Sequence, residues 1–155
     1  MFIICAHLSA GTANGNPGFD HAMIKMLGIG PSVEKVLLCG VGCSGGLATL
    51  RTAANLALGY AYQGKPARIL CIAIEVTSIF HRSELQSIIE SNEVRIGVCL
   101  FGDGAGAAIV SNGLGLKPDE HALGLYEMED WKHDVIPNST SALGFDIHPH
   151  GKSRR

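Results

Sequence analysis

The 155-residue sequence has little charge of either sign and few aromatic side chains: 17% of its residues are charged and 6% are aromatic. Its formal net charge is −2, so no excess of positive charge predicts binding to nucleic acid or to an anionic membrane. No apolar run reaches membrane-spanning length, and the opening MFIICA is too short for the core of a signal peptide. Hydrophobic residues make up 46% of the chain, which indicates a globular protein of one domain.

The five cysteines include no C-x-x-C pair. An odd count without paired spacing favours reduced thiols, so we expect a cytoplasmic protein without a disulfide framework. Four of the cysteines are expected to be buried and unreactive, as is usual for free cysteines, most of them in strand-like apolar runs. They are Cys5, Cys39, Cys71 and Cys99. Cys43 differs because it lies in a glycine-rich turn.

Strand-like and helix-like segments alternate along the chain, which predicts an α/β layered fold. Strands are expected over MFIICA, VEKVLLC and ARILCIAIEV, and the third is apolar throughout, as in a strand that is covered on both faces. A helix is expected to start with Asn16 as its N-cap and Pro17 in its first turn, and to end at Gly28 and Gly30.

A longer helix is predicted over residues 44–62, and it has almost no polar face. We therefore expect it to be buried between layers, which argues against a simple three-layer sandwich. Further along, SELQSIIESN is expected to form a short helix capped by Ser83. RIGVCLF and AGAAIVS are expected to be strands around a tight GDG turn, followed by a strand meander over HALGLYEMED, WKHDVIP and LGFDIHP.

The stretch GVGCSGG admits two functional interpretations. Its glycines, Gly40, Gly42 and Gly45, match the G-x-G-x-x-G pattern of dinucleotide-binding proteins, but that pattern needs an acidic residue about 20 residues further on. The candidate, Glu75, lies thirty residues past Gly45. The alternative is that Cys43 is a nucleophile, because a helix N-terminus stabilises a thiolate. Cysteine as a small packing residue in the turn is the third alternative, and the spacing favours the nucleophile.

Three blocks of the sequence, one of which contains this turn, resemble a known family. GVGCSGGLATLR, ARILCIAIEVTSIFHR and GVCLFGDGAGAAIVS resemble, in order and spacing, the type III polyketide synthases, the chalcone-synthase-like branch of the thiolase fold. NPGFDHAMIKMLGIGPSVEKVLL is similar to the segment that precedes the family's catalytic cysteine. The resemblance covers about residues 16–150, and CSGG looks more like microbial and fungal members, many of which take fatty acyl-CoA starters. Residues 151–155, GKSRR, are interpreted as an atypical solvated tail.

The resemblance implies an acyltransferase that condenses an acyl-CoA starter with malonyl-CoA, as a homodimer and without a metal or redox cofactor. Cys43 matches the cysteine that carries the acyl group. The block EVTSIFHR matches the segment with an aromatic gate to the cavity, where His81 is at the gate position and Phe80 lies beside it. Phe101, Gly102 and Asp103 match the FGDG loop that shapes the cavity. His148 and His150 are interpreted as a solvated loop rather than as metal ligands.

The family completes its catalytic triad with a histidine and an asparagine from its C-terminal half. The sequence stops at Arg155, before either residue, so we expect a truncated chain that is inactive by itself. Two alternatives stay open at this point. One is a ketoacyl-ACP synthase or thiolase relative with the same cysteine turn, and the other is a non-catalytic fragment.

Overall fold

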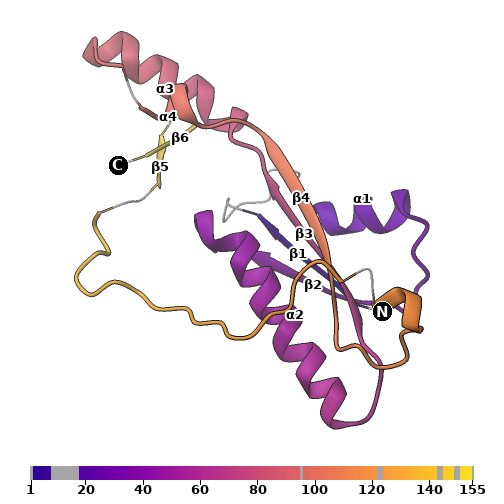
Figure 1. The fold of residues 1–155 in the computed structure, drawn as a ribbon. Helices are drawn as coiled ribbons and strands as arrows, with labels where there is room; N and C mark the ends of the chain where they lie inside the picture. Colours follow the sequence, from indigo (N-terminus) through magenta and orange to yellow (C-terminus); the bar gives the residue numbers. More distant parts are fainter. Residues whose placement is uncertain are drawn as a thin grey trace. The chain divides into compact units, whose positions relative to one another are not determined.

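The structure, a computed structural model, describes residues 2–7, 18–94, 96–121, 124–142, 145–148 and 151–154 (Figure 1). The chain forms two compact units. The first comprises Met1–Ile74 and Ala105–Lys132, and the second comprises Glu75–Gly104 and His133–Arg155. Among the described residues, no helix is both long enough and apolar enough to cross a membrane.

The four-stranded sheet belongs mainly to the first unit and has the strand order β2-β1-β3-β4. Its strands are β1 (Phe2–His7), β2 (Glu34–Cys39), β3 (Arg68–Glu75) and β4 (Gly104–Ser111). β1 pairs in parallel with both β2 and β3, so the carboxyl ends of these three strands meet at one edge of the sheet. The predicted strands over MFIICA, VEKVLLC, ARILCIAIEV and AGAAIVS are confirmed.

Helices α1 (Phe19–Met26) and α2 (Gly45–Tyr62) cover opposite faces of this sheet (Figure 1). The side chains of β3 alternate between the two faces, as the pleat of a strand requires. Ile69 and Cys71 pack in one cluster with Ala53 and Ala57 of α2. On the other face, the cluster consists of Ile72 and Phe19 with partly buried apolar neighbours from α1, β2 and β3, which include Met23, Ile24, Leu37, Leu70 and Ile74. β3 is therefore covered on both faces, as predicted.

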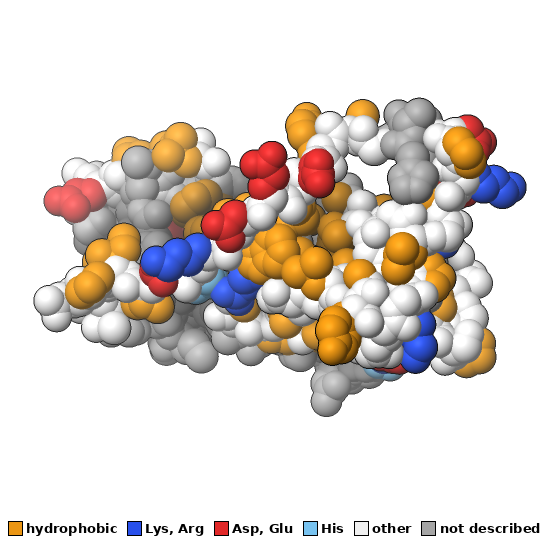
Figure 2. All heavy atoms as spheres, turned by 60° about the horizontal axis from the view of Figure 1, so that its bottom comes forward, with side chains coloured by type: hydrophobic (Ala, Val, Ile, Leu, Met, Phe, Trp, Pro, Cys, Tyr) orange, Lys and Arg blue, Asp and Glu red, His pale blue; other side chains and the backbone are white. Residues whose placement is uncertain are grey.

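Helix α2 is buried along one face only. Its buried positions are small residues, namely Gly45, Ala48, Thr49, Ala53, Ala54 and Ala57. On the opposite side Leu47, Leu58 and Tyr62 are 74%, 57% and 96% exposed. Hydrophobic side chains reach the surface of the molecule in several places (Figure 2). These 155 residues therefore leave one side of α2 uncovered, and burial around most of its circumference, which was expected for the helix within a complete protein, stays a prediction. A lack of polar side chains indicates that a face favours burial, but not which element covers it.

The start of α1 differs from the prediction. α1 begins at Phe19 with Gly18 as its N-cap, whereas Asn16 and Pro17 lie outside the described residues. Its end is as predicted, because Gly28 adopts a left-handed conformation with φ of +62° just after the helix.

The first turn of α1 is tied to β2 by a buried carboxylate. Asp20, 4% exposed, lies 3.1 Å from the Lys35 ammonium and 3.4 Å from the His21 ring. Burial alone would raise the pKa of Asp20, but the hydrogen bonds and charges of Lys35 and His21 outweigh burial and hold that pKa below its ordinary value. The ion pair therefore fixes α1 against the strand that leads to the glycine-rich turn.

The second unit contains α3 (Ser78–Ser91), α4 (Ile96–Leu100) and an antiparallel hairpin of β5 (Phe145–His148) and β6 (Gly151–Arg154). The prediction that Ser83 caps a helix is wrong: Ser83 lies inside α3, and its hydroxyl donates to the Phe80 carbonyl at 2.9 Å. α3 starts five residues earlier because Thr77 and Ser78 begin it, with Asp103 as their partner.

Two further predictions for the second half are corrected. The segment RIGVCLF was predicted as a strand, but most of it forms α4, so GDG is not a hairpin turn. Apolar runs of this length fit either a short helix or a buried strand, and tertiary contacts decide between them. The predicted meander is also wrong over residues 124–137, which form no strand, and only β5 within LGFDIHP is a strand. Residues 151–154, interpreted from the sequence as a solvated tail, form β6.

Candidate active site

The glycine-rich turn connects β2 to α2. Gly40 and Gly42 have φ of +69° and +63°, a left-handed conformation that residues with a Cβ rarely adopt. A short 3-10 turn over Gly42–Ser44 then leads directly into α2. The Ser44 hydroxyl donates to the Val41 carbonyl at 2.7 Å and closes the turn. The glycines at these two positions are therefore required by the backbone of the turn.

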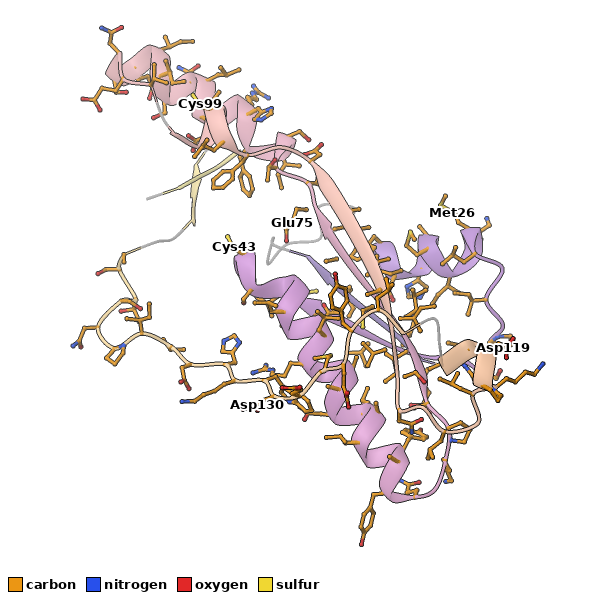
Figure 3. All side chains as sticks on the ribbon, in the orientation of Figure 1. Met26, Cys43, Glu75, Cys99, Asp119 and Asp130 are labelled. Atoms are coloured by element: carbon orange, nitrogen blue, oxygen red, sulfur yellow. The ribbon has the colours of Figure 1, made fainter. Side chains whose placement is uncertain are left out.

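Cys43 lies in this 3-10 turn, two residues before the first residue of α2, and its side chain is exposed (Figure 3). The first backbone N–H groups of a helix have no acceptor inside it and carry the positive end of the helix dipole. The start of a long helix is therefore a place where a negative charge, such as a developing oxyanion, is favoured. The predicted placement of Cys43, in a strand–turn–helix at a helix start, is confirmed, and its role as a nucleophile stays a prediction.

The other cysteines differ in burial, although all four were predicted to be buried. Cys71 is buried in β3, and burial raises the pKa of its thiol to about 11, so it is an inert packing residue. Cys39 and Cys99 are exposed, which contradicts the expectation of burial. Cys39 is the last residue of β2 and Cys99 lies in the short helix α4, so neither lies inside a covered strand. The side chain of Cys5 lies outside the described residues.

The five residues predicted to bind substrate all belong to the second unit. Phe80 and His81 lie in the first turn of α3, where Phe80 is 8% exposed and His81 is half-buried. Phe101, Gly102 and Asp103 form the loop after α4, where Phe101 is 44% exposed. The structure therefore brings the predicted residues together on one helix start and one loop.

Asp103 holds this loop to α3. Its carboxylate accepts hydrogen bonds from the backbone N–H and the hydroxyl of Ser78, both at 2.8 Å, and from the Thr77 hydroxyl at 3.4 Å. The hydrogen bonds from Ser78, and then those from Thr77, hold the pKa of Asp103 below its ordinary value. Sequence reasoning missed Thr77 and Ser78. A Thr-Ser pair directly after a buried strand was the available signal for a helix start.

The residues that the structure describes contain no group of three His, Cys, Asp or Glu side chains that could hold a metal ion. His148 lies in β5, and His150 lies outside the described residues.

A layered α/β arrangement with a cysteine near the start of the helix that connects two strands is typical of the thiolase-like fold, and similar solved structures share it. A fungal type III polyketide synthase, ORAS, superposes with a TM-score of 0.87 at 48% identity, over 99% of this chain and 39% of that one. CsyB complexed with CoA-SH superposes with a TM-score of 0.82 at 33% identity, over 99% of this chain and 40% of that one.

Residues 6–114 match the family model of the chalcone and stilbene synthases, N-terminal domain. The chain belongs to this family, the type III polyketide synthases. The acylalkylpyrone synthase csyB of Aspergillus oryzae is 45% identical over 109 residues, which are 70% of this chain and 28% of that protein. The chain thus spans 28–40% of the length of these relatives. Family membership contradicts the dinucleotide interpretation of the turn.

Proposed function

We propose that this chain is part of a type III polyketide synthase in which Cys43 carries the acyl group. The observation that supports the proposal most directly is the position of Cys43, in a turn built on two left-handed glycines at the start of an 18-residue helix. The relatives support the chemistry, because csyB is an acylalkylpyrone synthase and a solved structure of CsyB is complexed with CoA-SH. Phe80, His81, Phe101, Gly102 and Asp103 are proposed to shape the acyl-binding cavity.

The proposed reaction proceeds in two steps. The Cys43 thiolate attacks the carbonyl carbon of an acyl-CoA thioester, and the CoA thiolate leaves and takes up a proton. Malonyl-CoA then loses carbon dioxide, and the resulting carbanion attacks the Cys43 thioester. The new carbon–carbon bond forms as the carbon–sulfur bond breaks, which returns the Cys43 thiolate. The thioester activates the acyl group in both steps and decarboxylation drives the second, so the proposal includes no metal or redox cofactor.

The proposal also includes a homodimer in the cytoplasm with acyl-CoA and malonyl-CoA as its substrates. Family membership supports these three elements. Sedimentation equilibrium of the purified protein tests the dimer, and a monomer at all concentrations would contradict it.

The experiment that tests the proposal is acylation followed by intact-mass spectrometry. The protein is incubated with a fatty acyl-CoA, and the mass increase of one acyl group is followed together with released CoA thiol. We expect one adduct that is lost in Cys43→Ser and retained in Cys99→Ser, a matched control because Cys99 is also exposed. An adduct that persists in Cys43→Ser, or no adduct in the unaltered protein, would overturn the proposal.

A further inference from the structure

The start of α3 is capped from a distant part of the chain. Both oxygens of the Asp103 carboxylate are used: Oδ1 accepts from the Ser78 backbone N–H, and Oδ2 accepts from the Ser78 hydroxyl. The first N–H groups of a helix have no acceptor inside it, and a negative charge there is favoured by the helix dipole. Asp103 therefore supplies to α3 what a side chain at the N-cap normally supplies. Thr77, the N-cap itself, makes no such bond to the helix.

The same loop is also held at its other end. The Phe101 backbone N–H donates to the Gly97 carbonyl of α4 at 3.1 Å. A Cβ on Gly97 would lie 3.6 Å from both the Phe101 ring and the Glu84 carboxylate, so Gly97 faces α3 and Phe101 together. The three-residue loop from Phe101 to Asp103 thus bridges α4 and the start of α3.

We propose that Asp103 is a positioning residue that fixes Phe80 and His81 relative to Phe101. Phe80 is held two residues into α3, where its backbone N–H donates to the Thr77 carbonyl at 2.9 Å and its carbonyl accepts from Ser83. Because both oxygens of Asp103 are engaged by Ser78 and Thr77, Asp103 acts on the cavity through α3. The inference rests on the proposed function, in which Phe80, His81 and Phe101 shape the acyl-binding cavity, and it concerns the selection of the acyl chain rather than chemistry at Cys43.

Three variants and one control separate the effect of the hydrogen bonds made by Asp103 from the effect of its charge. Asp103→Ala removes the cap. Asp103→Asn keeps the acceptor for the Ser78 N–H, and its amide can donate to the Ser78 hydroxyl, so the geometry is retained without the charge. Ser78→Ala removes only the hydroxyl bond. Asp119→Asn makes the same charge change at an exposed position in α5 (Pro118–His121) of the first unit.

Two measurements are made on the full chain of each variant. The first is hydrogen–deuterium exchange of the first turn of α3, which does not depend on the proposed function. We expect about fivefold faster exchange at Ser78 in Asp103→Ala, a smaller increase in Ser78→Ala, and none in Asp119→Asn. The second is the ratio of Cys43 acylation rates with a short-chain and a long-chain acyl-CoA. We expect Asp103→Ala to change this ratio by about tenfold and Asp103→Asn to restore most of it.

The outcomes are distinguishable. If hydrogen–deuterium exchange at the first turn of α3 is unchanged in Asp103→Ala, Asp103 does not cap α3. This conclusion holds even if that variant binds substrate differently. Faster exchange with an unchanged acyl-chain ratio would overturn the positioning role, as would an Asp103→Asn variant that is no better than Asp103→Ala. If the unaltered protein is not acylated at all, the proposed function fails, while the exchange data still decide whether Asp103 caps α3.

Discussion

At the scale of single residues, the cysteines differ in how much of each thiol reaches solvent and in what surrounds it. Cys43, Cys39 and Cys99 are exposed, whereas Cys71 is buried with its pKa raised to about 11. Of the exposed three, only Cys43 lies within two residues of the start of a helix of more than eight residues. Because the thiolate is the reactive form, exposure and the positive end of a helix act together at Cys43 and at no other described cysteine.

Iodoacetamide labelling tests this difference. We expect Cys43 to be modified faster than the other four cysteines in the folded protein, and Cys71 to be modified only after unfolding. Peptide mapping after timed quenching gives each rate, and labelling in guanidinium chloride, where all cysteines are accessible, provides the control. Modification of Cys99 at the same rate as Cys43, or faster, would contradict the prediction.

Asp20 gives a second prediction at this scale. The Lys35→Met variant removes the cation 3.1 Å from a buried carboxylate, and we expect the free energy of unfolding to fall by about 2 kcal/mol. Lys117→Met, an exposed lysine in the same unit, is the control and should change stability by less than about 0.5 kcal/mol. Urea unfolding at pH 7 measures both. Equal midpoints for the two variants would show that the ion pair contributes nothing.

The pH dependence of the Asp20 interaction has a definite sign. The pKa of Asp20 is lower in the folded than in the unfolded chain, so the folded state holds fewer protons on this group. Its contribution to stability is therefore complete above the ordinary carboxyl pKa of about 3.9 and is lost as the pH falls through the lowered pKa. Below that range, Lys35→Met and the unaltered protein should have similar stability. A difference that persists unchanged to the lowest accessible pH would contradict this account.

At the scale of elements, glycine is favoured in the turn before α2 and disfavoured inside the helix. Gly42 has φ of +63°, so the Gly42→Ala variant should destabilise the chain by about 1–2 kcal/mol. Gly59 lies inside α2 with no atom within 4 Å of an added Cβ, so Gly59→Ala should stabilise it by up to about 1 kcal/mol. Thermal unfolding followed by circular dichroism compares the pair, and the same sign for both substitutions would contradict the backbone argument.

At the scale of the whole molecule, the 155 residues leave apolar surface on both sides of the first sheet. Leu47, Leu58 and Tyr62 are eleven and four residues apart, which places them on one face of α2. On the other side of the sheet, an apolar hollow of about 390 Å³ lies between α1 and strands β3 and β4. Its lining residues are Met23, Leu27, Leu70, Ile72, Ile74, Ala105, Gly106 and Ala107. Exposed apolar patches of this kind promote association.

We therefore expect these 155 residues, expressed by themselves, to self-associate in a concentration-dependent manner. The Leu58→Ser/Tyr62→Ser variant should shift sedimentation towards monomer. The matched control is Leu125→Ser/Tyr126→Ser, the same residue types at adjacent exposed positions outside any helix or strand, and it should have a smaller effect. An unaltered chain that sediments as a monomer at every concentration would contradict the prediction.

The sequence by itself determined the features that depend on local spacing. The strands over VEKVLLC and ARILCIAIEV, the helix from residue 45 to 62 and the glycine-rich turn that holds Cys43 all follow from periodicity and from glycine's freedom to adopt positive φ. The motifs around that turn also pointed to the family that the match over residues 6–114 confirms. These features are local, so a window of residues contains the information that specifies them.

Only the tertiary structure decided the features that depend on partners distant in sequence. RIGVCLF contains residues typical of strands, yet it packs as α4 beside α3, because neither strand nor helix is strongly specified in so short a run. Helix α3 starts at Ser78 because Asp103, 25 residues later, supplies acceptors for its first turn. Likewise, the exposed side of α2 depends on which surfaces the chain brings against it, and residue spacing carries no information about that.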